Sequence, residues 1–216
     1  MSKQILDRIN STIRATLNLR QWRSTNDVLK WFDLINDKKS KSFFQFDIIN
    51  FYPSISEKLF DDLLKFARKY IDVDPEEEEI LRNARKQILF WKGDTWTKIG
   101  GNLFDVSMGS PDGAELCELA GLFCLDLLRK KLPAEELGLY RDDGLGVTSK
   151  SGPGSSKIEK TLHSTFKGIG LKITTIVNVK KVEFHRSANP WILLWSYASS
   201  PDCFVEKEAP SGRTWA

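Results

Sequence analysis

Acidic residues at two distant points of the sequence have the type and setting that divalent-metal chemistry needs. Asp47 ends an aromatic-rich segment, and Asp142 and Asp143 follow 95 residues later in a Tyr-Arg-Asp-Asp-Gly segment. Nucleotidyl transfer with two cations requires carboxylates on neighbouring strands, so that both can bind the same ions. Neither position is specific by itself, because aspartate commonly ends strands and Asp-Asp-Gly is a common turn sequence. The prediction of a metal site therefore depends on the two positions meeting in the fold.

Histidine and cysteine chemistry has little support in this sequence. The chain of 216 residues has two histidines, His163 and His185, and three cysteines. Cys117 and Cys124 are seven residues apart in one expected helix, roughly 10 Å from each other, which is beyond disulfide reach. No Cys-x-x-Cys pair occurs, so a zinc site, a disulfide framework and most Ser-His-Asp or Cys-His schemes are disfavoured. We expect any chemistry to depend on carboxylates.

The charges are distributed unevenly along the chain, although the net charge is only +3. Residues 1–42 contain nine basic and four acidic residues, and residues 149–189 contain eight and two. Between them, residues 43–148 contain 13 basic and 20 acidic residues. Basic patches attract phosphate backbones, and acidic centres can hold divalent cations. The alternative is that each charged face is merely solvated.

Hydrophobic periodicity and turn signals predict the elements that would hold the carboxylates. We expect helices within residues 1–36, over 56–71, from Asp74 to before Gly93, over 114–128 and over 157–168. Strands are expected over 42–49 and 171–179, and hairpins over 94–107, with its turn at 100–102, and over 137–148. Pro53 is expected to end the first strand, and Ser54 and Glu57 to form a capping box.

This order of elements predicts an α+β fold with a split βαβ (ferredoxin-like) antiparallel sheet and helices packed on one face. The length suits one domain with a proper core. No apolar run approaches the roughly 20 residues needed to cross a bilayer, and the N-terminus lacks the apolar stretch of a signal peptide. We therefore expect an intracellular protein, in the nucleus or cytoplasm, that is neither secreted nor bound to a membrane.

Three patches, in this order, resemble the palm motifs of reverse transcriptases. They are the segment 46–55 (Phe-Asp-Ile-Ile-Asn-Phe-Tyr-Pro-Ser-Ile), the Gly-Ser-Pro of 109–111 before a long helix, and Tyr-Arg-Asp-Asp-Gly at 140–144. The resemblance extends from Gln21 to Phe184. The local sequence around the motifs is similar to that of enzymes encoded by eukaryotic mobile elements. It implies a polymerase palm and an RNA-directed DNA polymerase that uses an RNA template, a DNA primer and dNTPs.

The resemblance also implies the metal ligands. Asp47 and Asp142 would bind two Mg²⁺ ions, which Mn²⁺ can replace, and the backbone carbonyl of Ile48 would complete one coordination shell. Asp143 would be an accessory catalytic carboxylate.

Other residues would contact the nucleotide if the resemblance holds. The residues implied are Phe51, Tyr52, Gly109, Ser110 and Pro111. Tyr52 is preferred over Phe51 as the side chain that would clash with a 2′-hydroxyl and so favour deoxynucleotides; the alternative is a packing role. A lysine would protonate the leaving pyrophosphate, and the candidates are Lys172, Lys180 and Lys181.

The resemblance divides the chain into remnant fingers (1–42), a palm catalytic domain (43–184) and an irregular C-terminal tail of uncertain origin (185–216). Only 46 residues precede Asp47, so we expect truncated fingers, and the chain is expected to be a fragment of a retroelement protein. Two alternatives remain: a catalytically inactive nucleic-acid-binding palm remnant, and an RNA-directed RNA polymerase. The second ranks lower, because those enzymes more often have Gly-Asp-Asp and commonly lack a bulky residue at the Tyr52 position. The oligomeric state stays open.

Overall fold

The computed structural model describes residues 1–86, 88–96, 103–107, 109–132, 136–149, 154–179, 183–186 and 193–196. The chain divides into two compact units, Met1–Val179 and Lys180–Ala216. The described part of the second unit is one antiparallel pair, β8 (Glu183–Arg186) with β9 (Leu193–Ser196). Everything else below concerns the first unit. It includes the expected fingers remnant of residues 1–42, whereas the expected palm boundary at 184 falls inside β8.

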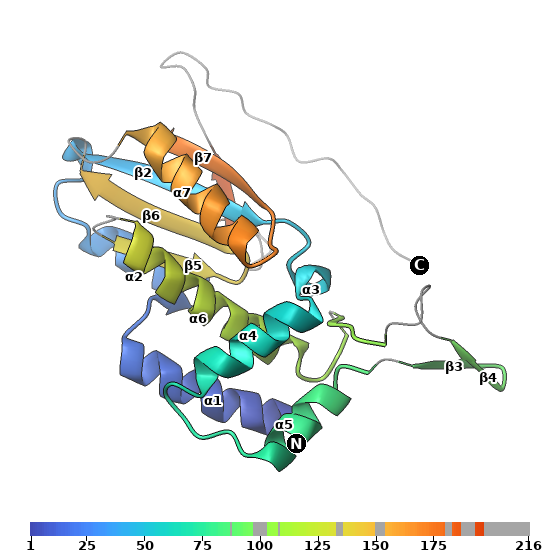
Figure 1. Ribbon diagram of the computed structural model, residues 1–216. Coiled ribbons are helices and arrows are strands. Elements are labelled where there is room, and N and C mark those ends of the chain that lie inside the picture. The colour runs from blue at the N-terminus through green and yellow to red at the C-terminus, as the bar shows by residue number, and fades with distance from the viewer. Residues whose placement is uncertain are drawn as a thin grey trace. The chain divides into compact units, whose positions relative to one another are not determined.

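A five-stranded sheet forms the frame of the first unit, with strand order β1-β5-β6-β2-β7 (Figure 1). Its strands are β1 (Gln21–Trp22), β2 (Lys41–Ile48), β5 (Glu136–Tyr140), β6 (Asp143–Ser149) and β7 (Ile173–Val179). β1 is parallel to β5, and every other neighbouring pair is antiparallel. The predicted α+β class and the two strands and hairpin assigned to this sheet are confirmed.

Two glycines of β6 set the fit between the central strands β2 and β6. The antiparallel register places Phe44 opposite Gly146 and Phe46 opposite Gly144. A Cβ atom on Gly144 would lie 2.0 Å from the Phe46 ring, and one on Gly146 would lie 2.1 Å from the Phe44 ring. Each aromatic ring therefore lies directly over backbone that has no side chain. On its other side, the Phe46 ring contacts the Phe166 ring of α7, with 5.2 Å between centroids.

Helix α6 (Gly113–Lys131) is the central helix, as its nearly continuous apolar sequence predicts. Leu116, Leu119 and Leu122 are fully buried. Around it pack α1 (Ser2–Leu17), α4 (Glu57–Ala67) and α7 (Ser155–Gly168), and α6 and α7 cover one face of the sheet (Figure 1). Among the described residues, no helix is both long and apolar enough to span a membrane.

Helix α1 attaches to α6 through an apolar stripe flanked by polar contacts. Ile5, Ile9 and Ile13 are buried, as expected from their four-residue spacing. Asn10 Nδ2 donates to the carbonyl of Glu115 over 2.8 Å, and Arg14 pairs with Glu118 over 3.0 Å. These two polar contacts add directional links between α1 and α6 to the apolar packing. The helices predicted in residues 1–36 are confirmed.

The prediction that all helices pack on one face of the sheet is wrong for α2 (Thr25–Leu34). Phe32 of α2 contacts Phe43, whose side chain points away from the face that Phe44 covers, with ring centroids 5.6 Å apart. Trp31 of the same helix contacts Trp22, with centroids 5.0 Å apart. The Trp22 indole lies over Gly138 of β5, where a Cβ atom would be 2.3 Å from the ring. These aromatic contacts hold α2 on the opposite face, at one end of the sheet.

Two local predictions fail near the first strand. Ser56 rather than Ser54 is the N-cap of α4, and it accepts a hydrogen bond from Leu59 N over 3.2 Å. Pro53 lies inside a short helix, α3 (Phe51–Ser54), instead of merely ending β2. Proline fits the first turn of a helix, where its missing N–H has no partner to lose.

The hairpin after α5 also differs from the prediction. Helix α5 (Pro75–Asn83) begins with the predicted cap Asp74, which forms a capping box with Glu77, and it ends at Asn83, before Gly93 as predicted. Strands β3 (Leu89–Trp91) and β4 (Asp94–Trp96) form a hairpin that the sequence did not predict, with its turn at residues 92–93. Lys92 and Gly93 both have positive φ, 51° and 87°, which is the geometry of a two-residue turn. The predicted turn at 100–102 lies outside the described residues.

The glycine–phenylalanine fit predicts a stability defect. Gly144→Ala should lower the free energy of unfolding by about 1–3 kcal/mol, because the buried Phe46 ring has no space into which it can move. Gly168→Ala is the matched control, since no atom lies within 4 Å of its Cβ position. It should be neutral or slightly stabilising. Urea unfolding of both variants tests this, and an equal midpoint for Gly144→Ala and the native chain would contradict it.

Candidate active site

The structure brings the two distant acidic positions together at one end of the sheet. Asp47 of β2 lies directly opposite Asp143 of β6, and directly opposite residues of an antiparallel pair have Cβ atoms about 4.5–5.5 Å apart. Asp142 lies in the two-residue turn between β5 and β6, because Tyr140 pairs with Asp143. The N–H of Ile48 donates to the carbonyl of Asp142 over 3.1 Å. This bond attaches the turn to the end of β2.

Asp47, Asp142 and Asp143 are all half-buried, and burial and like charges raise the pKa values of Asp47 and Asp143. Burial, followed by the charges of Asp142 and Asp47, raises the pKa of Asp143 to about 7. Burial, followed by the charge of Asp142, also raises the pKa of Asp47. Desolvated like charges disfavour ionisation, so the cluster has more negative charge than its surroundings stabilise. A bound cation would relieve that cost.

The donor set fits an ion that is shared with a phosphate group. Carboxylate and carbonyl oxygens are the ligands that Mg²⁺ prefers, and Mg²⁺ is commonly bound by one or two carboxylates together with substrate phosphates and water. Within the described ranges, no three His, Cys, Asp or Glu side chains are arranged to hold a metal ion by themselves. The oxygen atoms at this end of the sheet are thus of the type that Mg²⁺ binds, but the described side chains do not form a complete metal site by themselves.

Tyr52 lies beside this cluster, on the short helix α3. Asn50, with φ 50°, turns the chain out of β2 into that helix. The Tyr52 ring packs on the first turn of α6, with its Cε1 atom 3.5 Å from the Cβ position of Gly113. Burial is the main cause that raises the pKa of Tyr52, and the charge of Asp142 also raises it. By contrast, Phe51 is 4% exposed and belongs to the hydrophobic core, so it is not available to a ligand.

The Gly-Ser-Pro loop reaches the same region through Gly113. Gly109 and Pro111 are exposed, and Ser110 is half-buried. The N–H of Gly113 donates to the carbonyl of Ser110 over 3.2 Å. A Cβ atom on Gly113 would lie 2.5 Å from Ser110 Oγ, so the absence of a side chain lets the loop and Tyr52 meet at the start of α6. Gly113 is not among the residues predicted from the sequence, although a glycine that opens a buried helix is a signal of close approach.

One of the three candidate lysines lies beside the cluster. The N–H of Ile49, just after β2, donates to the carbonyl of Lys172 over 2.9 Å. Lys172 is exposed, while its neighbours Leu171 and Ile173 are buried in the core. Strand alternation then puts the Lys172 side chain on the sheet face that carries Asp47. Lys180 and Lys181 lie outside the described residues.

A buried ion pair that the sequence did not reveal supports the loop. Arg85 and Asp112 are each 1% exposed and form a salt bridge. The carbonyl of Arg85 also accepts from Asp105 N over 2.9 Å. Asp112 precedes α6 but does not cap it with its side chain. The pair therefore attaches the segment after α5 to the start of α6, which holds the Gly-Ser-Pro loop against Tyr52. Asp112 reads as an ordinary helix cap, and nothing distinguishes Arg85 in the sequence.

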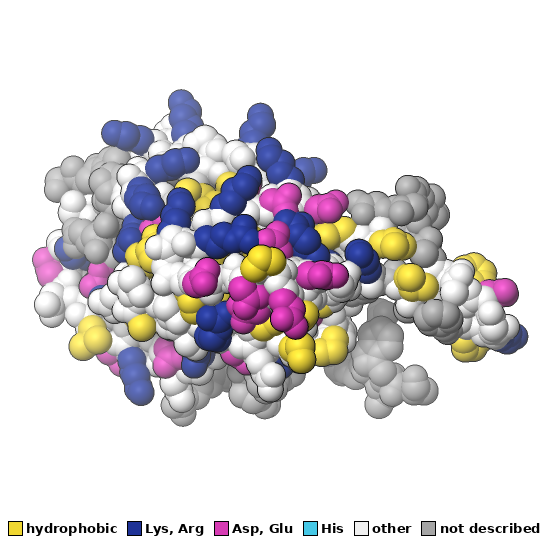
Figure 2. Space-filling model, turned by 60° about the horizontal axis from the view of Figure 1, so that its bottom comes forward, with side chains coloured by type: hydrophobic (Ala, Val, Ile, Leu, Met, Phe, Trp, Pro, Cys, Tyr) yellow, Lys and Arg dark blue, Asp and Glu magenta, His cyan; other side chains and the backbone are white. Residues whose placement is uncertain are grey.

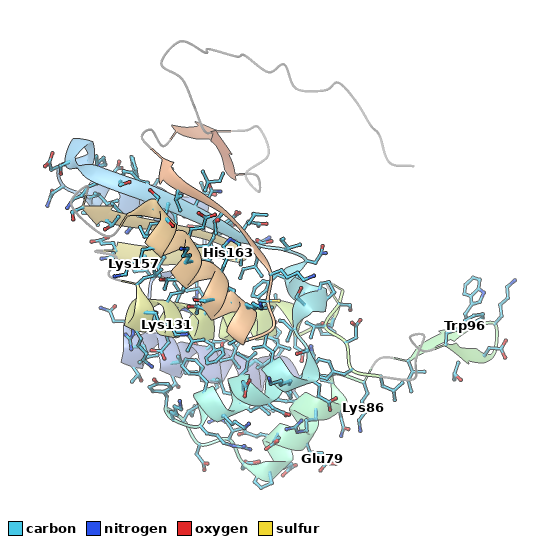
Figure 3. The ribbon with its side chains drawn as sticks, turned by 45° about the horizontal axis from the view of Figure 1, so that its top comes forward. Glu79, Lys86, Trp96, Lys131, Lys157 and His163 are labelled. Atoms are coloured by element: carbon cyan, nitrogen blue, oxygen red, sulfur yellow. The ribbon has the colours of Figure 1, made fainter. Side chains whose placement is uncertain are left out.

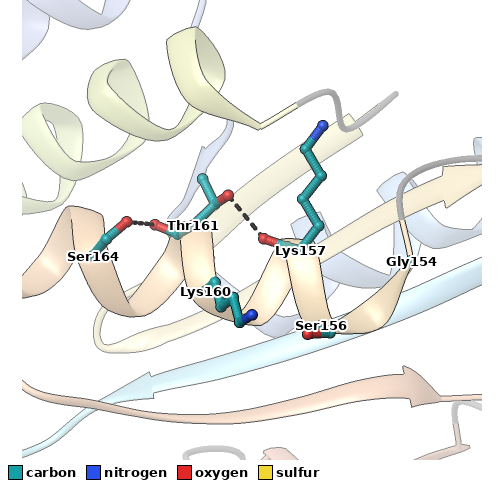
Figure 4. A pocket seen from close by; sticks show the side chains of 6 residues that line it. All are labelled: Gly154, Ser156, Lys157, Lys160, Thr161 and Ser164. Carbon is teal, nitrogen blue, oxygen red and sulfur yellow. Dashed lines mark hydrogen bonds between the residues drawn. The ribbon is translucent and has the colours of Figure 1, made fainter.

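Basic side chains gather on one face of the protein (Figure 2), and Lys131 and Lys157 lie on its helical layer (Figure 3). A hollow of about 620 Å³ along α7 is lined by Lys157, Lys160 and polar neighbours (Figure 4). Its hydroxyl groups bond back to their own helix: Thr161 Oγ1 donates to the carbonyl of Lys157 over 2.8 Å. None of its lining residues belongs to the carboxylate cluster, so we interpret this hollow as a solvated helix face.

Comparison with solved structures relates the fold to polymerases. Telomerase from Candida albicans, solved in complex with the TWJ fragment of telomeric RNA, aligns with 82% of this chain at a TM-score of 0.52 and 18% identity. The RNA-dependent RNA polymerase of a human picobirnavirus, as an insertion-loop deletion mutant, aligns with 82% at a TM-score of 0.51 and 14% identity. The chain spans about a third of each, 34% and 35% of their lengths. No protein-family model and no curated protein sequence matches the chain. At these identities the likeness concerns the fold alone, which is similar to the fold of part of each of these two polymerases.

The buried ion pair predicts a non-additive pair of mutations. Arg85→Ala should cost about 3–5 kcal/mol of unfolding free energy, because it leaves the Asp112 carboxylate buried and unpaired. The double variant Arg85→Met, Asp112→Leu should be more stable than Arg85→Met alone or Asp112→Leu alone. A double-mutant cycle from urea unfolding measures the coupling. Additive effects would mean that the two charges do not depend on each other.

The raised pKa of Asp143 predicts a pH dependence. Its carboxyl group has a pKa of about 7 in the folded chain against a usual 3.8, so between these values the folded state holds a proton that the unfolded state has lost. The resulting stabilisation is complete below 3.8 and is lost as the pH rises to about 7. In EDTA, the unfolding free energy of Asp143→Asn minus that of the native chain should therefore increase as the pH rises from about 4 to about 7. Asp33→Asn, at an exposed site, should show no such gain.

Proposed function

We propose that this chain contains the catalytic centre of an RNA-directed DNA polymerase, which transfers dNTPs to the 3′-hydroxyl of a DNA primer on an RNA template. The observation that carries the proposal is the meeting of Asp47, Asp142 and Asp143 beside Tyr52, in a fold similar to telomerase. The chain corresponds to about a third of each solved polymerase, so full polymerase activity and a mobile-element origin are part of the proposal.

The connectivity supports the interpretation of the sheet as a polymerase palm. β2 and β5 run in the same direction with β6 between them, since β6 is antiparallel to both. β6 and β7 are likewise separated by β2. Both are the connections expected of a split βαβ sheet, in which crossing helices join strands that are not neighbours. In this arrangement the turn between β5 and β6 lies at the end of β2.

Asp47 and Asp142 would bind two Mg²⁺ ions, which Mn²⁺ can replace, with the carbonyl of Ile48 as a backbone ligand. When bound, the ions would activate the primer hydroxyl and neutralise charge on the triphosphate. Asp143, with its pKa of about 7, would be partly protonated near neutral pH. It would therefore act as an accessory carboxylate whose charge state responds to the ions nearby.

The remaining residues would orient the nucleotide. The Tyr52 ring, supported by Gly113, would form the wall against which the sugar lies and would exclude a 2′-hydroxyl. The loop of Gly109, Ser110 and Pro111 would let its backbone approach the nascent base pair, which glycine permits sterically. Lys172 would give a proton to the leaving pyrophosphate from the side of β7. Base pairing would select the nucleotide, while protein contacts would be mainly to the nucleic-acid backbone.

RNA-templated primer extension tests the catalytic carboxylates. Asp142→Asn should reduce extension by dNTPs and Mg²⁺ by about a hundredfold or more, because metal binding contributes several kcal/mol to the transition state. Asp33→Asn, with the same chemical change at an exposed site, should extend like the native chain. Absence of extension by the native chain, with salt-sensitive duplex binding retained, would favour the nucleic-acid-binding remnant instead.

Nucleotide choice separates the two polymerase readings, which the likeness in fold does not distinguish. Replacing Tyr52 by alanine should increase use of NTPs relative to dNTPs by roughly ten- to a hundredfold, because the side chain that excludes the 2′-hydroxyl is removed. The measurement is the ratio of kcat/KM values for dGTP and GTP. If the native chain already prefers GTP, it is an RNA polymerase and the assignment of Tyr52 is wrong.

A further inference from the structure

The β3–β4 hairpin projects from the first unit as an arm (Figure 1). Among the described strands, β3 and β4 pair with each other alone, in a two-stranded sheet of their own. At the base of the arm, Lys86 bridges to Phe104, and Arg85, which is held by the buried ion pair, accepts a hydrogen bond from Asp105. The tip turns at Lys92 and Gly93. Residues 85 and 86 at its base are thus bonded to the segment 104–105, and residues 91–96 at its end are exposed to solvent.

The arm exposes two tryptophans on one face. Trp91 is 64% exposed and Trp96 is 56% exposed. Trp91 pairs with Asp94, and Trp96 pairs with Leu89, so strand alternation puts both indoles on the same side of the ribbon. As diagonal neighbours, the two residues have Cα atoms about 7–8 Å apart, within reach of aromatic side chains. Figure 3 shows Trp96 extending from the ribbon, away from the helices.

Folding alone does not account for these two rings. A tryptophan stabilises a protein when its large surface is buried, and an isolated two-stranded hairpin is at best marginally stable in water. Here the two indoles are instead displayed together where they contribute little to the described core. Exposed apolar surface of this kind, with polar neighbours, marks interaction sites.

Two charged side chains flank the indoles: Lys92, and the exposed Asp94 directly opposite Trp91. The paired flat rings, together with the cation on one of them, favour single-stranded nucleic acid as the occupant. Lys92 Nζ lies over the Trp91 ring, 5.6 Å from its centroid, and Lys86 is exposed at the base of the arm (Figure 3). Figure 2 shows hydrophobic and charged side chains together along the projecting arm. Surfaces that bind single strands combine aromatic rings, on which bases stack, with cations that meet the phosphates. A cation over an exposed indole matches this combination better than it matches an apolar protein surface.

We propose that the β3–β4 arm is a binding site for single-stranded nucleic acid, separate from the carboxylate cluster. Bases stack on Trp91 and Trp96, and Lys92 binds a neighbouring phosphate. The site reads no sequence, because every base offers a flat face. Binding here does not require that the carboxylate cluster be catalytic, so the two proposals can succeed or fail separately.

Fluorescence anisotropy with a labelled twelve-nucleotide oligouridylate tests the site, using the full chain with Asp142→Asn. The double variant Trp91→Ala, Trp96→Ala should bind about tenfold or more weakly, because base stacking on each ring is lost. Trp91→Phe with Trp96→Phe should restore much of the affinity. Leu34→Ala, which truncates a 74% exposed side chain of α2, is the control and should bind like its parent. Circular dichroism checks that every variant is folded.

The salt dependence separates the two kinds of contact. Lys92→Asn keeps a residue that tolerates the positive φ of the turn, and it should reduce the slope of log Kd against log salt by about 1. The tryptophan variant should shift the affinity without changing that slope. Unchanged affinity in the tryptophan variant, or no binding by the parent, would overturn the proposal. Self-association of the parent that the tryptophan variant abolishes, with oligonucleotide affinity unchanged, would assign the arm to a second copy of the chain.

Discussion

The arrangement of the candidate active site depends on the contact between two phenylalanine rings and the backbone of two glycines. Phe44 and Phe46 can lie flat on β6 only opposite Gly146 and Gly144. A shift of one residue would turn each side chain to the other face of the sheet and put a ring against Leu145. The correct register thus has a steric cause that lies outside the site. Its result is that Asp47 comes opposite Asp143, with Asp142 in the adjoining turn.

The sequence predicted most of this sheet because the signals are local and strong. Aromatic alternation identifies β2, and the Tyr-Arg-Asp-Asp-Gly segment identifies the β5–β6 hairpin, although the turn itself is Arg141-Asp142. The errors arose where nearby residues compete. Ser54 and Ser56 are both plausible caps, and which of them caps α4 depends on where α3 ends. Arg85 could not have been found, because its importance comes from a partner 27 residues away and from burial that no local pattern encodes.

Acidic residues serve two opposite purposes in this fold. Glu78, on α5, is bonded to Arg82 and Arg68, and those bonds lower its pKa. Such exposed pairs contribute little stability individually, but they add no unbalanced charge. At the end of β2 the carboxylates have raised pKa values instead. This contrast supports the assignment of function to the cluster, since strongly perturbed groups of like charge gather at functional sites more often than elsewhere.

The buried Arg85–Asp112 pair has an evolutionary consequence. A lineage that replaces one of these charges alone passes through a protein with a buried unpaired ion, which is strongly destabilised. Neutral drift at either position is therefore blocked, although exchange of both for apolar residues would be tolerated. In related sequences the two positions should change together or not at all. That covariation would be visible even in copies whose carboxylate cluster has been lost, because it protects the fold and not the chemistry.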